Sequence, residues 1–62
     1  MTPNEMKAKA LIIGKQLEKL DWYNMTADDA DQYCIAKAKE LGADDTQAGI
    51  ISYLAMDFVL KV

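Results

Sequence analysis

The sequence has no histidine, no arginine and only one cysteine. Histidine is the usual general acid or base near neutral pH, and a serine or cysteine nucleophile needs a neighbouring base to activate it. The chain therefore lacks the residues on which most catalytic sites depend. We expect it not to be an enzyme.

Metal ligands are scarce as well. Cys34 is the one thiol or imidazole ligand, whereas a structural zinc site needs four. The carboxylates of Asp28, Asp29 and Asp31 lack the glycine turn and the distal glutamate of a calcium loop. The sequence therefore predicts no metal and no cofactor. A lone cysteine also excludes an internal disulfide, so we expect a cytoplasmic protein with Cys34 packed as a small apolar residue; an intermolecular bridge is the alternative.

Long hydrophobic runs are absent too. Ser52, Asp57 and Lys61 interrupt the most apolar stretch, which stays shorter than the roughly 18 residues of a membrane span. The 62 residues are 52% hydrophobic, which is too apolar for a disordered chain. We expect one soluble domain over residues 1–62, with a net charge of −3 from ten acids and seven lysines.

Three signals for the start of a helix divide the chain. In each, a hydroxyl or carboxylate residue is followed three positions later by an acid or an amide: Thr2 with Glu5, Thr26 with Asp29, and Asp44 with Gln47. Pro3 suits a first helical position, and Gly42 is typical of the residue that closes a helix. These signals predict helices over residues 3–22, 27–41 and 45–61, in an all-α, compact three-helix domain.

Apolar residues recur along one side of the first two predicted helices. The first stripe contains Met6, Ala10, Ile13, Leu17 and Leu20, and the second contains Ala27, Ala30, Cys34, Ala38 and Leu41. At the helical period both stripes are predicted to face the core, and the small residues of the second allow close approach. Leu11, Ile12 and Ile35 point away from these stripes, which indicates a shared interface.

The third predicted helix has two apolar stripes. One contains Ile51, Leu54, Ala55, Phe58 and Val62, and the other contains Gly49, Tyr53, Met56 and Leu60. A helix that is apolar all round is normally buried all round, and two short helices cannot easily cover it. We therefore predict that the second stripe is a self-interface, with a homodimer favoured over a higher oligomer. The alternative is a central third helix with a half-exposed rim.

Charge is distributed unevenly. Residues 1–20 carry Lys7, Lys9, Lys15 and Lys19 against two glutamates, +2, whereas residues 21–62 carry three lysines against eight acids, −5. Acids cluster at the start of the second predicted helix, at Asp28, Asp29 and Asp31, and at the start of the third, at Asp44 and Asp45, which suits helix capping and the helix dipole. They are also candidates for contact with a basic partner surface that normally receives phosphates.

Trp22 and Tyr23 are adjacent at the end of the first predicted helix. Aromatic residues are enriched at the centres of interfaces, which makes this pair a second candidate for binding a partner. The alternative is that both side chains cover the end of the core. The sequence leaves the two interpretations open.

Residues 35–54 resemble a helix-turn-helix motif in their spacing. Ala38 and Gly42 occupy the small-residue and turn-glycine positions, and Ala43, Ala48 and Ile51 follow. The resemblance implies DNA binding, yet the would-be recognition helix starts with Asp44 and Asp45 and has no base before Lys61. A recognition helix needs lysine or arginine near the phosphates. Lys7, Lys9, Lys15 and Lys19 of the first predicted helix would then have to contact the DNA.

In size, acidity and lack of catalytic residues the chain is similar to the small accessory and inhibitor proteins of phages and other mobile elements. This likeness implies that the partner is a host protein, such as a nucleic-acid-handling or defence complex. The functional hypothesis is a small acidic module that binds another protein. The alternative is a weak DNA-binding helix-turn-helix regulator that uses the lysine-rich first helix.

Overall fold

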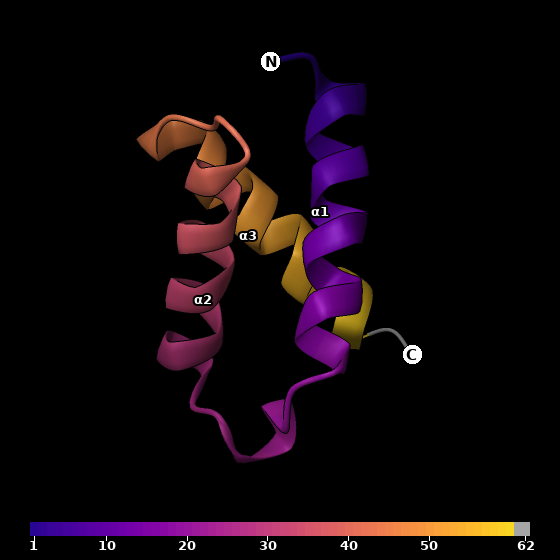
Figure 1. Ribbon diagram of the computed structural model, residues 1–62, viewed down its shortest axis with the longest axis vertical. Coiled ribbons are helices and arrows are strands. Elements are labelled where there is room, and N and C mark those ends of the chain that lie inside the picture. The colour runs from indigo at the N-terminus through magenta and orange to yellow at the C-terminus, as the bar shows by residue number, and fades with distance from the viewer. Residues whose placement is uncertain (61–62) are drawn as a thin grey trace.

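The computed structural model describes residues 1–60 and contains three α-helices (Figure 1). These are α1 (Pro3–Glu18), α2 (Ala27–Glu40) and α3 (Asp45–Leu60), with one 3₁₀ turn, η1 (Trp22–Asn24), between the first two. Residues 1–60 contain no strand, so the prediction of an all-α, three-helix chain is confirmed. No helix in this part of the chain combines the length and apolar character needed to cross a membrane.

The starts of the three helices are the ones that the sequence predicted. In each, the side-chain oxygen of the capping residue accepts a hydrogen bond from the backbone N–H three residues on: Thr2 from Glu5 at 3.1 Å, Thr26 from Asp29 at 3.1 Å, and Asp44 from Gln47 at 2.8 Å. These bonds satisfy N–H groups that have no partner within the helix. The predicted caps are therefore confirmed.

The end of α2 also follows the prediction. Gly42 has a φ of 99°, which a residue with a Cβ rarely adopts. Its N–H donates to the carbonyl oxygen of Lys39 at 3.0 Å, and the N–H of Ala43 donates to that of Ala38 at 3.1 Å. This pair of bonds is the Schellman arrangement, and the two alanines are buried beneath it. Gly42 thus turns the chain sharply from α2 into α3.

The first helix is shorter than predicted. Helix α1 ends at Glu18, whereas we expected it to reach residue 22. The N–H groups of Lys19 and Leu20 bond three residues back, which tightens the last turn, and Asp21 then leaves the helical conformation. The Asp21 carboxylate accepts a hydrogen bond of 2.6 Å from the Asn24 side chain, which supports the 3₁₀ turn.

Three residues predicted for the core lie outside it, all at helix ends. Leu20 and Leu41 are each 41% exposed, and Ala27 is exposed. Leu20 and Leu41 follow the last helical residues, so the backbone no longer directs them along the apolar stripe. Helix α2 ends at Glu40, one residue before the prediction, and the predicted end of the third helix at Lys61 lies outside the described residues.

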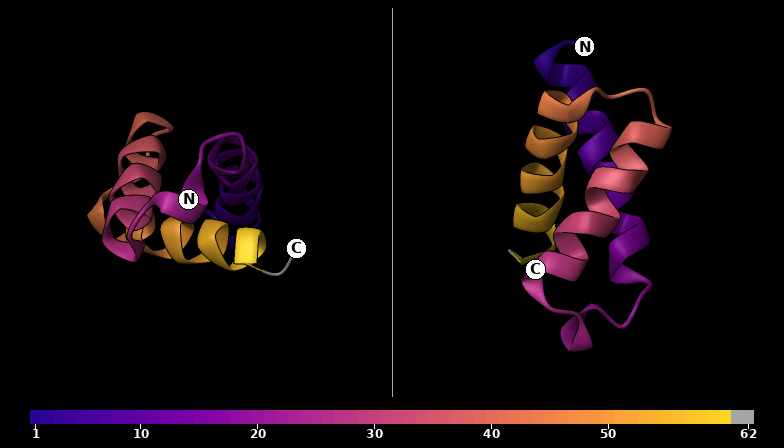
Figure 2. Two further views of the ribbon diagram at one scale, coloured as in Figure 1. Left: turned by 90° about the horizontal axis from the view of Figure 1, so that it is seen from below. Right: turned by 90° about the vertical axis from the view of Figure 1, so that its left-hand side faces the viewer.

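The helices form two layers. Helices α1 and α2 lie next to each other, and α3 crosses one face of the pair (Figure 2). The core between the layers is built mainly from Ile13, Leu17, Cys34, Ala38, Ile51 and Ala55. At Gly14, α1 comes so close to α3 that a Cβ there would lie 2.9 Å from Cδ1 of Phe58. Small residues therefore set the distance between the two layers.

Candidate functional site

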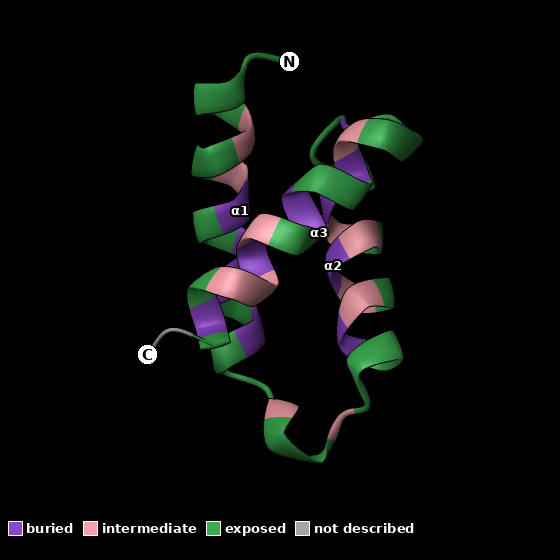
Figure 3. Ribbon diagram, turned by 180° about the vertical axis from the view of Figure 1, so that it is seen from behind, coloured by how far each residue is buried: buried purple, intermediate pink, exposed green. Residues whose placement is uncertain are grey.

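One side of α3 remains uncovered by the rest of the chain (Figure 3). We call this side the outer α3 face; it consists of Gly49, Ile50, Tyr53, Met56, Asp57 and Leu60. Tyr53 is 71% exposed and Leu60 is 67% exposed, while Ala48, Ile51 and Ala55 on the other side of the helix are fully buried. A single copy of the chain thus buries Ile51 and Ala55 of the first predicted stripe and leaves Phe58 37% exposed, while Val62 lies outside the described residues. Of the second stripe it covers Met56 in part and leaves Tyr53 and Leu60 exposed.

The four residues predicted as a self-interface line one hollow. Gly49, Tyr53, Met56 and Leu60 surround a space of about 310 Å³, which Asp31 of α2 and Asp57 of α3 also border. The walls are mainly apolar side chains, and both charged groups are carboxylates. This surface is therefore suited to apolar side chains that carry a positive charge nearby.

Helix α3 borders a second hollow on the side of α1. This space of about 350 Å³ is lined by Lys7, Ala10, Leu11, Leu54, Asp57 and Phe58. Asp57 borders both hollows, so its carboxylate lies between two apolar depressions. Ile50 and Asp57 were not predicted as site residues, although the helical period places both on the same side of α3 as Tyr53.

Asp31 is held in place from inside the molecule. The hydroxyl of Ser52, which is fully buried on α3, donates a hydrogen bond to the Asp31 carboxylate on α2. Burial and, to a smaller extent, the charge of Asp31 raise the pKa of the neighbouring Cys34 thiol to about 11, and the Ser52 hydroxyl partly opposes this shift. The thiol is therefore protonated at neutral pH and packs as an apolar residue.

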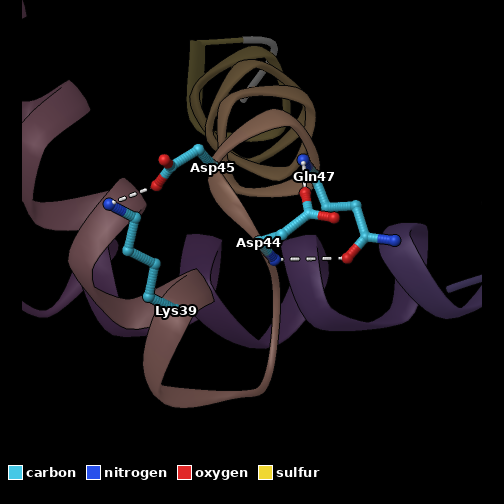
Figure 4. A network of polar contacts seen from close by, with 4 residues as sticks. All are labelled: Lys39, Asp44, Asp45 and Gln47. Carbon is cyan, nitrogen blue, oxygen red and sulfur yellow. Dashed lines mark hydrogen bonds and ion pairs between the residues drawn. The ribbon is translucent and has the colours of Figure 1, made fainter.

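The acidic candidates do not form one surface. Asp28 and Asp29 are exposed on the first turn of α2, whereas Asp31 is half-buried. Asp44 caps α3 through its bonds with Gln47, and the Lys39 ammonium lies 2.8 Å from an Asp45 carboxylate oxygen (Figure 4). The hydrogen bond and charge of Lys39 lower the pKa of Asp45. Within residues 1–60, no three or more histidine, cysteine, aspartate or glutamate side chains form a group that could hold a metal ion.

The lysines of α1 do not all lie on one side of the helix. Lys7 borders the hollow between α1 and α3, and Lys9 is half-buried on the opposite flank, about 160° away around the helix. Lys15 and Lys19 are exposed and lie within about 40° of each other. Lys7 lies about 80° from Lys15 and about 120° from Lys19, so these three lysines lie within one arc of about 120° and Lys9 lies outside it.

The adjacent aromatic residues Trp22 and Tyr23 differ in their contact with the core. The rings of Trp22 and Tyr23 stack with centroids 4.3 Å apart and planes at 24°. Trp22 packs against the core, while Tyr23 is 78% exposed. The two side chains border a small hollow with Glu18 and Val59 at the end of the molecule.

Of the three apolar residues predicted to point away from the core, Leu11 and Ile12 are exposed as expected, but Ile35 is half-buried against the core.

The structure thus brings together the predicted self-interface residues, adds Asp31, Ile50 and Asp57 to them, and separates the acidic candidates. Asp31 could be assigned to this site only once the packing of α2 on α3 was known, because that packing joins it to Ser52. Comparison of the chain with models of known protein families, with curated proteins and with solved structures found no match.

Proposed function

We propose that the protein is a small acidic module that binds another protein through the outer α3 face. The observation that carries this proposal is the exposure of Tyr53 and Leu60 around an apolar hollow on a helix whose opposite side is fully buried. Extended apolar surface of this kind usually marks an interaction site. Tyrosine and methionine are also residues enriched in the centres of interfaces.

The first partner that we propose is a second copy of the chain. A domain of 62 residues buries a smaller share of its unfolded surface than a larger domain does, and association adds apolar contact. A standard interface covers about 800 Å² on each partner. The accessible surface of this chain is 4130 Å², so such a contact would cover about a fifth of it.

The test is the solution mass measured by light scattering over a range of concentrations. We expect the wild type to be larger than one chain, and the double variant Tyr53→Glu, Met56→Lys to be monomeric. The matched control makes the same two changes at Tyr23→Glu and Met25→Lys, because Met25 is also half-buried against the core. Circular dichroism checks that each variant is helical. A wild type that stays monomeric, or a double variant with unchanged mass, would overturn the self-interface.

The exposed carboxylates at the start of α2 support a narrower proposal about a further partner. Asp28 and Asp29 would meet a basic surface on a host nucleic-acid-handling protein or defence complex, in the place of phosphates. The variant Asp28→Asn, Asp29→Asn should then lose retention of such proteins, and added salt should weaken the wild type. Glu18→Gln, Glu40→Gln changes the net charge equally and should retain them. Equal retention by both variants would contradict this role.

The alternative, weak DNA binding, has less support. Asp44 caps helix α3 and Asp45 begins it, so their charges would repel phosphates, and Lys9 lies outside the arc of about 120° that contains the other three lysines of α1. A salt-sensitive mobility shift that Lys7→Gln, Lys9→Gln and Lys15→Gln abolish would favour DNA binding over the protein-binding proposal.

A further inference from the structure

Asp31 gives the hollow on the outer α3 face a negatively charged edge. Its carboxylate is half-buried, and one oxygen accepts the hydrogen bond from the hydroxyl of Ser52, which is fully buried. Within residues 1–60 the other oxygen, Oδ2, has no hydrogen-bond or ion-pair partner. A group that is already held in position loses little freedom on binding. Asp31 is therefore suited to pair with a cation from another molecule.

The other walls of the hollow extend along α3. The lining residues on this helix run from Gly49 to Leu60, a rise of about 16 Å, or three helical turns. Tyr53 and Leu60 are largely exposed, and the space beside Gly49 is open. An amphipathic helix presents apolar residues at i, i+4, i+7 and i+11 over the same length. The hollow therefore fits the apolar side of such a helix.

The position of Asp31 specifies where the cation must lie. Asp31 contacts α3 at Ser52, three residues after Gly49 and eight before Leu60. The carboxylate is therefore nearer the Gly49 end of the hollow and on the side of α2. An ammonium group needs one oxygen, whereas a guanidinium in its bidentate arrangement needs two. Because Ser52 already contacts one oxygen, a lysine at the edge of the partner's apolar stripe fits best.

We propose that the outer α3 face docks an amphipathic helix of another protein and that a lysine of this helix pairs with Asp31, an inference that rests on the proposed binding role of this face. A second copy of the chain would cover the same apolar residues, but its own outer α3 face carries no lysine. The lysine-bearing helix therefore has one favourable contact more than the second copy. It should bind in place of that copy, so that self-association and partner binding exclude each other.

The test uses two synthetic peptides of about 14 residues, held helical by a staple on the side opposite to their leucines. Both carry leucine at i, i+4, i+7 and i+11 and otherwise alanine and glutamine. The lysine peptide has one lysine at the edge of the leucine stripe, and the glutamine peptide has glutamine there. Fluorescence anisotropy of a dye on the peptide measures the affinity. We expect the lysine peptide to bind roughly tenfold more tightly, since a hydrogen bond to a charged group is lost in the other.

Variants of the protein test the role of Asp31. Asp31→Asn keeps an oxygen that can accept the Ser52 hydrogen bond but removes the charge. It should weaken binding of the lysine peptide roughly tenfold and leave the affinity for the glutamine peptide unchanged. The matched control Asp29→Asn makes the same change on α2, about 160° around the helix, and should leave both affinities unchanged. Tyr53→Glu should abolish binding of both peptides, and Leu60→Glu replaces it if circular dichroism shows a loss of helix.

Light scattering tests the exclusion between the partner and the second copy. Where the wild type is larger than one chain, an excess of the lysine peptide should convert it to one chain with one peptide. A complex that keeps two chains while the peptide is bound would show that the peptide and the second copy occupy different surfaces, and would overturn the inference.

The remaining outcomes overturn the inference in distinguishable ways. If neither peptide binds although the wild type associates through Tyr53 and Met56, the binding role of the outer α3 face stands and the lysine-bearing partner is wrong. If Asp31→Asn and Asp29→Asn lose affinity equally, the net charge attracts the peptide and the pairing with Asp31 is wrong. If Tyr53→Glu binds as tightly as the wild type, the peptide docks elsewhere. A wild type that is monomeric and binds neither peptide would overturn both this inference and the proposed binding role.

Discussion

The two sides of α3 differ in the size of the apolar side chains that they present. The buried side consists of Ala48, Ile51, Ser52, Ala55 and Val59, whereas the outer side presents Tyr53, Met56 and Leu60. Small residues allow α1 and α2 to pack closely against α3. The close approach of α1 to α3 at Gly14, where a Cβ would lie too near Phe58, is an example. Large residues with space around them can accept the side chains of another molecule. Size therefore separates the contact within this chain from the contact we propose between chains.

The largest difference between the two sides should appear on removing side chains. We expect Ile51→Ala to lower the free energy of unfolding by about 3 kcal/mol, because Ile51 is fully buried and leaves a cavity. Leu60→Ala should change it by less than about 0.5 kcal/mol in the monomer. Chemical denaturation at a concentration where the chain is monomeric measures both values. Equal losses would show that the outer side also stabilises the fold.

The thiol that faces the buried side of α3 should make stability depend on alkaline pH. The pKa of Cys34 is raised from 9.0 to about 11, so the folded state holds this proton more tightly than the unfolded chain. Its contribution is fully present below pH 9 and is lost as the pH rises toward 11, by about 2 kcal/mol. Cys34→Ala should remove that part of the slope in denaturation measured from pH 8 to 11. An unchanged slope would show that Cys34 does not contribute to it.

The polar contact on the buried side should contribute less. Ser52→Ala removes the hydrogen bond to the Asp31 carboxylate and should cost about 1–2 kcal/mol. The double variant Ser52→Ala, Asp31→Ala should cost less than the sum of the single variants, since the two residues act as a pair. Additive losses in thermal denaturation would show that the bond contributes nothing of its own.

The glycines should give the smallest difference. Gly49 on the outer side has open space where a Cβ would stand, so Gly49→Ala should stabilise the helix by about 1 kcal/mol. At Gly14 the same Cβ would lie 2.9 Å from Cδ1 of Phe58, and displacing that ring offsets the gain. Thermal unfolding of the two variants tests the comparison, which fails if Gly14→Ala is the more stable.

The sequence predicted features that depend on neighbouring residues better than features that depend on packing. The caps at Thr2, Thr26 and Asp44 need only a residue three positions away. The position of Leu20 depends on where α1 stops, and no breaker residue marks that place before Asp21. The helical period alone places Tyr53 on the same face of α3 as Gly49, Met56 and Leu60, which line the same hollow.

The sequence did not predict which residues of different helices contact one another. The sequence groups Asp31 with Asp28 and Asp29 near the start of the second helix, because it does not say which side of α2 meets α3. The bond from Ser52 separates it from Asp28 and Asp29. Asp57 was seen only as an interruption of an apolar run, and its place between two hollows depends on α1 as well as α3.

The stacked pair at η1 gives the molecule an optical reporter of its own. Trp22 is the one tryptophan of the chain, and it packs against the core at the joint between α1 and α2 with Tyr23 stacked on it. All indole fluorescence therefore originates from this joint. Its emission should shift to longer wavelength when the joint opens and water reaches the ring, so folding can be followed at micromolar concentration without an attached dye.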